Sequence, residues 1–277
     1  MKVFFRSIVF LVIIGSVTGC IEEVPNEAKF EQQVFVSGFL VNTTDSVRVY
    51  IVRTTPVSDL SRDPVNDAKI SLYTKDPEGN VSLLTDNFLV NKGKYTTSEK
   101  ITCLVGNHYW IEVELPDDTK LMSAVELMKP SIPITDIVKT EGFTRIVFKD
   151  PPEERNFYLM HFILYKNAEP VADIFKLSAD VLYNGNENAF VEIDNTYGNW
   201  VFGSIQNLNF TTYQYYLNSF SQYEKNIDYQ IEGGDPGLLF QSPPAELLGN
   251  ITNITTNKTA LGFFGVFSYD YGYKQFE

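Results

Sequence analysis

The chain has 277 residues, of which 44% are hydrophobic and 21% charged, a composition typical of folded globular proteins and not of disordered, collagen-like or coiled-coil chains. Its length suits one large domain or two modest ones, and its 14% of aromatic residues favours strands over helices. Lys and Arg number 22 against 35 Asp and Glu, and no stretch gathers the basic residues, which argues against nucleic acid as a partner. Two histidines and two cysteines leave little for a metal site or a catalytic triad, so we expect no cofactor.

Residues 1–19 have the features of a secretory signal peptide. Lys2 and Arg6 precede an unbroken apolar run from Ile8 to Ile14, and small or short residues follow it. The apolar stretch is about half of the roughly 20 residues that a membrane-spanning helix needs, so a retained anchor is the weaker interpretation.

The signal ends in Val17-Thr18-Gly19-Cys20, which resembles the lipobox of bacterial lipoproteins. In a lipobox the cysteine thiol receives a diacylglycerol, so Cys20 is the predicted lipidation site and the first residue of the mature chain. Two or more acyl chains give stable anchoring to a membrane. A disulfide between Cys20 and Cys103 is the alternative.

Residues 20–32 form the predicted lipidated tether. Glu22 and Glu23 follow the lipid site and resemble the signal that exports lipoproteins of the Bacteroidetes group to the outer face of the outer membrane. An ordinary solvated tether is the alternative. Removal of residues 1–19 leaves 20 basic and 35 acidic residues, so the mature chain carries a formal charge of minus 15.

Residues 33–130 form the predicted first domain. Short runs that alternate branched and polar residues are separated by turns every 8 to 12 residues, which is typical of a Greek-key β-sandwich of about seven strands. The clearest predicted strands are 34–41, 47–52, 68–75 and 108–115.

Residues 131–277 form the predicted second, β-rich domain, because Pro130 and Pro133 interrupt the strand pattern at its start. We expect strands at 134–139, 144–148, 157–165, 189–193, 200–205 and 261–269. One short helix is predicted near 212–224, with Thr211 and Gln214 as its capping box. Aromatic residues repeat at helical spacing along it, and core packing explains that stripe better than a ligand platform.

Segments Pro243–Ile251 and Leu261–Phe267 resemble the closing signature of a Bacteroidetes lipoprotein family known only as a domain of unknown function. Strand 34–41, Gly93-Lys94-Tyr95 and Val105–Tyr109 fit the same family. The resemblance implies an immunoglobulin-like or carboxypeptidase-regulatory-like sandwich at the amino end. It also implies a TonB-dependent outer-membrane transporter as a neighbour and partner, and it carries no catalytic residues.

Enzymatic motifs are not evident, and we expect no catalytic residue. His108 and His161 each lie within a predicted strand, where a structural role is more common than general-base catalysis. Cys103 is predicted to be a buried, inert thiol. The acidic pairs Asp117-Asp118 and Glu153-Glu154 lack the alternating spacing of a calcium loop, so no metal site is predicted.

Two turn-rich segments are the candidate ligand or partner contacts. Tyr197 and Trp200 lie in a loop that mixes aromatic and turn residues, as loops that bind a glycan or a peptide do, although core aromatics at the start of a strand explain it better. Gly233 and Gly234 lie in the other segment. We expect a surface-exposed outer-membrane lipoprotein that is a non-enzymatic accessory subunit (capture module, lid or structural subunit) of a TonB-dependent transporter. A stand-alone structural, adhesion or ligand-binding lipoprotein is the alternative, and a hydrolase is the third class.

Overall fold

The computed structural model describes residues 31–55, 63–194, 197–231 and 249–276, with only the backbone described for 222–231. The described chain is mainly β, as predicted, and Gln33–Glu277 groups into one compact unit. Strands β1 (Val34–Val41), β11 (Ile134–Lys139), β12 (Thr144–Phe148) and β15 (Ala189–Ile193) have the predicted bounds.

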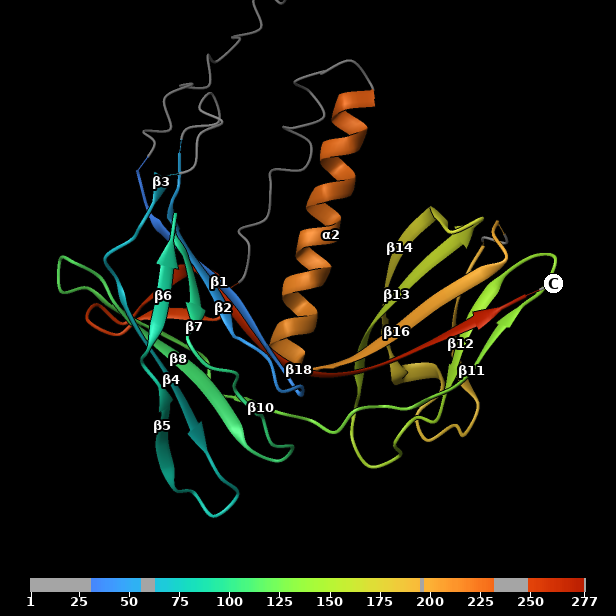
Figure 1. Ribbon diagram of the computed structural model, residues 1–277, viewed down its shortest axis with the longest axis horizontal. Coiled ribbons are helices and arrows are strands. Elements are labelled where there is room, and N and C mark those ends of the chain that lie inside the picture. Colours follow the sequence, from blue (N-terminus) through green and yellow to red (C-terminus); the bar gives the residue numbers. More distant parts are fainter. Residues whose placement is uncertain (1–30, 56–62, 195–196, 232–248, 277) are drawn as a thin grey trace, which may run out of the picture. The chain divides into compact units, whose positions relative to one another are not determined.

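The amino-terminal sandwich consists of two sheets that share one strand (Figure 1). One sheet has the order β6-β7-β2-β1-β18 and the other β5-β4-β8-β9-β17-β18. Their other strands are β2 (Arg48–Arg53), β4 (Lys69–Lys75), β5 (Val81–Thr85), β6 (Phe88–Asn91), β7 (Lys94–Thr97), β8 (His108–Glu114), β9 (Lys120–Ser123), β17 (Ile251–Asn253) and β18 (Lys258–Gln275). The two-residue strands β3 (Asp63–Pro64) and β10 (Glu126–Leu127) pair with β2 and β8. Inward side chains of both sheets form one core that includes Val36, Leu72 and Ile111.

Strand β18 continues from this sandwich into a second one. Its first half pairs in parallel with β1, from Leu261 to Phe267, and its second half pairs antiparallel with β16 (Trp200–Leu208), from Ser268 to Gln275. The segment 251–267, which the sequence assigned to the second domain, therefore contributes strands to the first sandwich. Gly262 permits the parallel contact, because it has a φ of +123° and a Cβ there would lie 2.0 Å from the carbonyl oxygen of Val36.

The second sandwich packs four strands against three. The larger layer has the order β14-β13-β16-β18 and the smaller layer the order β11-β12-β15. Its remaining elements are β13 (Phe157–Lys166), β14 (Glu169–Ala179), a short 3-10 helix (Asp180–Leu182) and β16 (Trp200–Leu208). Tyr158, Met160 and Phe162 on β13 face the core between the layers, with Phe148 and Ile205 among their neighbours.

Helix α2 (Phe210–Ile231) is longer than predicted. Tyr213, Tyr216 and Phe220 pack on the outer face of the larger layer, which confirms a packing role for these three rings, whereas Leu217 is exposed. The predicted capping box is wrong, because Thr211 lies inside the first turn and its hydroxyl donates to Glu126. In the described part of the chain no helix is long and apolar enough to cross a bilayer.

Glu126 on β10 joins the first sandwich to the start of α2. Its side chain is only 4% exposed, and its two oxygens accept hydrogen bonds from Thr211, Thr212, Asn250 and the backbone N–H of Val266. The Thr212 hydroxyl is 3.0 Å and the Val266 nitrogen 3.2 Å from the same carboxyl oxygen. A buried carboxyl group with this many donors holds β10, the start of α2 and β18 together.

Candidate functional site

Several predicted site residues lie outside the described residues. These are the lipidation site and export signal, Cys20, Glu22 and Glu23, and the two glycines of the second candidate loop, Gly233 and Gly234. Lipidation, export and a role of the two glycines therefore stay predictions.

His108 and Cys103 both have structural surroundings in the first sandwich. Burial, with Lys75 nearby, lowers the pKa of His108 and favours its neutral form. Cys103 is a free, buried cysteine, and burial raises the pKa of its thiol to about 12. At neutral pH this thiol is protonated and a poor nucleophile.

His161 has a carboxylate partner but no hydroxyl partner among the described residues. Its Nε2 lies 2.6 Å from Oδ1 of Asp173, and its ring stacks on Phe175 at a centroid distance of 4.1 Å. Ser204 stands opposite His161 in the β13–β16 register, yet no hydrogen bond joins their side chains. His161 and Asp173 thus form a base and its orienting carboxylate on the outer face of a sheet, but no described hydroxyl or thiol is bonded to His161 as a nucleophile.

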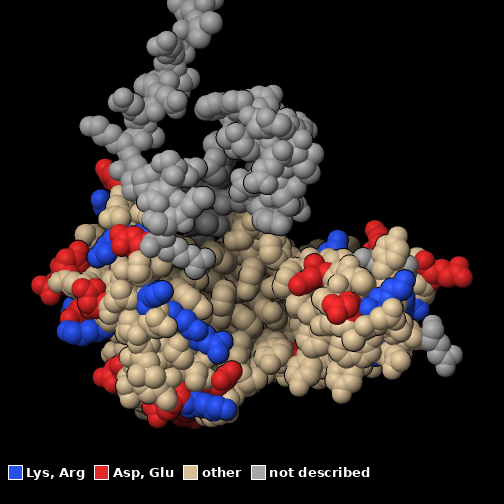
Figure 2. Space-filling model, turned by 45° about the horizontal axis from the view of Figure 1, so that its top comes forward, with Lys and Arg blue, Asp and Glu red and all other residues tan. Residues whose placement is uncertain are grey.

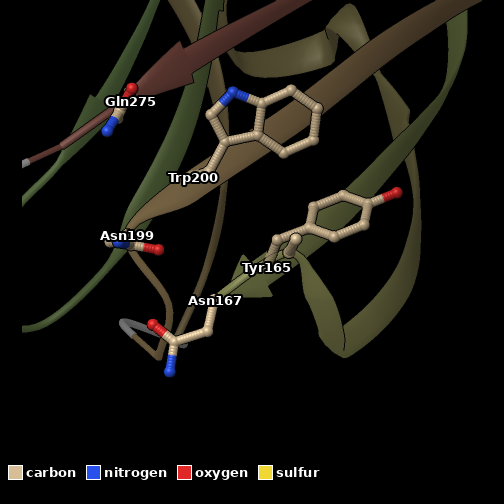
Figure 3. Close-up of a pocket in the computed structure, with 6 residues that line it drawn as sticks. Tyr165, Asn167, Asn199, Trp200 and Gln275 are labelled. Carbon is tan, nitrogen blue, oxygen red and sulfur yellow. The ribbon is translucent and has the colours of Figure 1, made fainter.

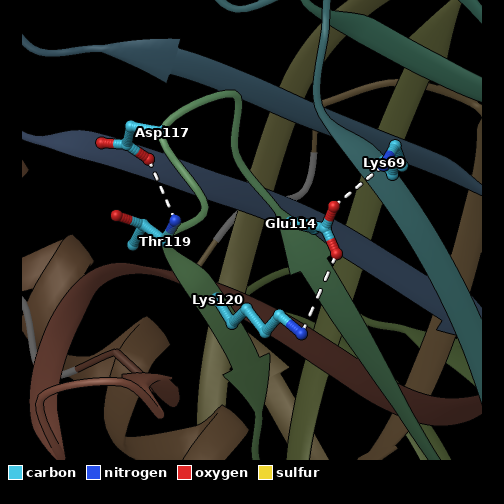
Figure 4. A network of polar contacts seen from close by, with 5 residues as sticks. All are labelled: Lys69, Glu114, Asp117, Thr119 and Lys120. Carbon is cyan, nitrogen blue, oxygen red and sulfur yellow. Dashed lines mark hydrogen bonds and ion pairs between the residues drawn. The ribbon is translucent and has the colours of Figure 1, made fainter.

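Several exposed acidic residues of the first sandwich serve turns and ion pairs. Glu114 accepts from Lys69 at 2.9 Å and lies 4.0 Å from Lys120, and Asp117 accepts from the backbone N–H of Thr119 (Figure 4). The hydrogen bond from Lys69 is the main cause that lowers the pKa of Glu114. Among the described residues no three His, Cys, Asp or Glu side chains converge as ligands of a metal ion. Basic and acidic side chains are interspersed on the face shown in Figure 2.

The outer face of the larger layer in the second sandwich is aromatic. Directly paired residues share one face of a sheet, so the register places five neighbouring rings together. They are Tyr165 on β13, Trp200 and Phe202 on β16, and Tyr271 and Tyr273 on β18. We call these five rings the aromatic face. Tyr271 is 56% and Tyr273 68% exposed, so two large aromatic side chains of this face are open to solvent.

A pocket of about 460 Å³ lies at the end of the aromatic face, and we call it the Trp200 pocket. It is lined by Tyr165, Asn167, Ala168, Asn199, Trp200 and Gln275. The phenol of Tyr165 meets the indole of Trp200 edge-on at 4.7 Å, while the amides come from three separate segments (Figure 3). Its volume is within the range of about 300 to 1,000 Å³ typical of small-molecule sites.

Hydrogen bonds hold the loop before Trp200 in place. The backbone N–H of Asn199 donates to Tyr165 at 2.9 Å, and the Asn199 carbonyl accepts from Phe276 at 2.8 Å. Gly198, with a φ of +97°, makes this approach feasible, because a Cβ there would lie 2.5 Å from the Tyr165 carbonyl oxygen. Lys139 donates to the Gly198 carbonyl. The pocket is therefore built on fixed backbone.

The structure brings one predicted residue into this pocket and adds others. Trp200 lines it, whereas Tyr197 lies in the same loop, 74% exposed, outside the lining. Sequence reasoning missed Tyr165, Asn167 and Gln275, which come from β13, the β13–β14 turn and the end of β18. The alternation of Tyr269, Tyr271 and Tyr273 was a usable signal for an aromatic sheet face.

Three solved structures are distantly similar to this chain. The FN1–FN3 domains of chicken CNTN1 match with 12% identity and a TM-score of 0.25 over 63% of this chain, which spans 60% of that fragment. CBD12 from CALX1.2 matches at 11% identity and a TM-score of 0.19, over 64% of this chain and 81% of that one. Trypsin-activated alpha-2-macroglobulin from Escherichia coli matches at 11% identity and a TM-score of 0.21, over 66% and 15% of the two chains.

No curated protein matches the sequence. Residues 21–271 match the model of one protein family. The match covers nearly all of the described residues. The chain thus belongs to the DUF4249 family, whose defining feature is a domain of unknown function.

Proposed function

We propose that this chain is a non-enzymatic binding lipoprotein of the outer-membrane surface that acts as an accessory subunit of a TonB-dependent transporter. The observation that carries the proposal is the aromatic face, which leaves Tyr271 and Tyr273 more than half exposed outside both cores. Exposed apolar surface of this kind marks contact sites for ligands or other proteins.

Sequence features support the location. The signal peptide, the lipobox-like residues up to Cys20 and the acidic pair Glu22 and Glu23 fit a lipid-anchored protein facing the exterior. The resemblance to Bacteroidetes lipoproteins supports the partner. None of the described His or Cys residues has the partners that nucleophilic catalysis needs, and this favours binding over hydrolysis.

Affinity purification tests the partnership. The tagged lipoprotein, extracted from outer membranes in mild detergent, is expected to recover a large β-barrel protein in near-stoichiometric amount, because a lasting specific interface buries about 1,200 to 2,000 Å². Tyr271→Ser together with Tyr273→Ser is expected to reduce that recovery, and Tyr50→Ser, an exposed tyrosine of the first sandwich, serves as the matched control. Recovery of the lipoprotein alone in several detergents contradicts the proposal and favours the stand-alone alternative.

Mass spectrometry and protease accessibility test the location. The mature chain is expected to begin at a lipidated Cys20, and protease added to intact cells is expected to degrade it. Replacement of Glu22 and Glu23 by alanine is expected to make the protein protease-resistant until the outer membrane is broken. An unmodified Cys20, or resistance of the unaltered protein on intact cells, contradicts the location.

A further inference from the structure

We propose that the Trp200 pocket binds a neutral saccharide. The inference rests on the proposed role as a binding protein and names the class of its ligand. The site offers aromatic rings and uncharged amides, and each part of that lining matches a part of a sugar ring.

The two rings supply the apolar contact. Tyr165 and Trp200 meet at an interplanar angle of 66°, and Tyr273 lies beyond the indole at a centroid distance of 5.8 Å. The face of an aromatic ring carries partial negative charge, so it attracts the weakly positive C–H groups on the apolar face of a pyranose. Trp200 is thus the expected stacking platform.

Three amides supply the polar contact. Within the described residues, no hydrogen bond engages the side-chain amides of Asn167, Asn199 and Gln275. Each amide has two donors and an acceptor, and a sugar hydroxyl likewise donates one hydrogen bond and accepts others. Neighbouring hydroxyls on a sugar ring can therefore pair with an amide through both of its ends.

The absence of charge among the six lining residues argues against an acidic or basic ligand.

The strand order argues against an extended peptide. Tyr165 and Trp200 lie on β13 and β16, which each pair with a strand on both sides, so their backbone groups are already bonded. Addition of a peptide strand requires a free sheet edge, and the edges of this layer are β14 and β18, which carry neither ring.

The turn that carries two of the lining residues is strained. Asn167 and Ala168 have φ angles of +52° and +66° in the two-residue β13–β14 turn, where glycine is the preferred second residue. A left-handed alanine costs about 1 kcal/mol or more, and such strain is concentrated at functional sites. Together with the bonded Asn199 backbone, this turn fixes the backbone from which the amides of Asn167 and Asn199 project, which lowers the entropy lost on binding.

The test begins with the full lipoprotein in detergent. It is applied to an array of neutral oligosaccharides of glucose, mannose and galactose, uronic-acid and sulfated oligosaccharides, and extended peptides. Neutral saccharides are the expected ligands. Preference for acidic saccharides or for peptides overturns the proposal, as does failure to bind any neutral saccharide at millimolar concentration.

Fluorescence then locates the site. The chain has two tryptophans, and Trp110 is only 7% exposed in the first sandwich, so a saccharide-dependent change reports on Trp200. Affinities of the Trp200 variants are measured by titration calorimetry, because these variants lack the reporting indole. Trp200→Ala is expected to weaken binding at least tenfold, and Trp200→Phe, which keeps a ring, clearly less. Asn199→Asp is expected to weaken binding of neutral saccharides, because an ionised carboxylate lacks the two N–H donors of the amide.

Tyr73→Ala is the matched control, because Tyr73 stacks on Trp110 at 5.4 Å in the other sandwich and does not line the pocket. Its saccharide affinity is expected to equal that of the unaltered protein. Binding that survives Trp200→Ala, in a variant with an unchanged circular dichroism spectrum, overturns the assignment. Recovery of the β-barrel partner, measured without saccharide, tests the proposed function separately.

Discussion

The two sandwiches share β18 but differ in the outer surface of their sheets. In the first sandwich, Lys69, Glu114 and Lys120 form an ion-pair network on adjacent strands. In the second sandwich, outward positions on β16 and β18 carry Trp200 and Tyr273, whereas an ion pair of Arg145 with Glu192 lies on the smaller layer. Both sandwiches bury an apolar core, so stability alone does not require the second surface to be aromatic.

This difference separates a structural surface from a binding surface. Mixed exposed charges contribute little to stability but keep a β-protein soluble. Exposed rings have the opposite effect on solubility, and their presence on a folded chain indicates a contact that offsets it. Four pairs of substitutions compare regions of the molecule, and they follow from the largest expected effect to the smallest.

Glu126→Ala tests how much the junction between the first sandwich and α2 contributes to stability. It leaves the donors of Thr211, Thr212 and the Val266 N–H without their acceptor, and we expect the free energy of unfolding to fall by about 3 to 5 kcal/mol. Urea denaturation followed by circular dichroism measures it. Glu187→Ala, which removes an exposed partner of Lys149, is expected to cost less than about 1 kcal/mol. Equal costs of the two substitutions contradict a structural role for Glu126.

The same substitution at two points of β18 compares its two halves. Gly262→Ala is expected to cost about 3 kcal/mol, because its Cβ clashes with the backbone of Val36 and its φ is positive. Gly272→Ala, in the second half, has its nearest atoms at 3.8 Å and is expected to change stability by less than about 1 kcal/mol. Thermal unfolding measures both. Similar shifts in Tm contradict the close parallel contact.

Trp200→Ala distinguishes a surface ring from a core ring. Its edge-on contact with Tyr165 predicts a loss of about 1 kcal/mol, whereas Phe148→Ala in the core of the same sandwich is expected to cost about 3 to 5 kcal/mol. Denaturant unfolding of the two variants measures the ratio. A cost for Trp200 as large as that for Phe148 supports the packing interpretation of this ring.

Lys274→Met has the smallest expected effect. The hydrogen bond from Lys274, 2.7 Å long, lowers the pKa of Asp136, so the pair stabilises the fold above the unfolded pKa of about 3.9 and loses that contribution as the pH falls through the lowered pKa. Both side chains are more than 40% exposed, so solvent screens the pair and the cost at pH 7 is expected to stay below about 1 kcal/mol.

Unfolding of the unaltered and Lys274→Met proteins is compared at pH 7 and at about pH 2. The difference in stability is expected to be smaller at the lower pH. Lys258→Met, at the exposed start of β18, is the control with no ion pair among the described residues. A difference that grows on acidification contradicts a stabilising contact between Lys274 and the ionised Asp136.

The local pattern of residues predicted most strands. It could not predict which strands pair, because pairing joins residues that are far apart in the sequence. Strand Val34–Val41 follows from alternation alone, whereas its partner in β18 lies at the other end of the chain. Strand Glu169–Ala179 was not predicted, because Pro170 opens it and exposed Val171 and Phe175 blur the contrast between its faces.

The candidate site was predictable only in part for the same reason. Loop composition indicated Trp200, but Tyr165 and Gln275 reach the pocket only through the register of β13, β16 and β18. A register is a property of paired strands and cannot be read from one of them. The capping role predicted for Thr211 is wrong because its hydrogen-bond partner, Glu126, lies on β10 of the first sandwich, far away in the sequence.

The shared strand also sets the order in which the chain can fold. Synthesis runs from the amino end, so β1 lacks its parallel neighbour until Lys258–Gln275 has been made. The amino-terminal sandwich therefore cannot complete itself as an independent early unit, and contacts between the two ends of the chain make folding slow. Until its last strand has been made, the sheet that contains β1 and β2 keeps an unpaired edge at β1.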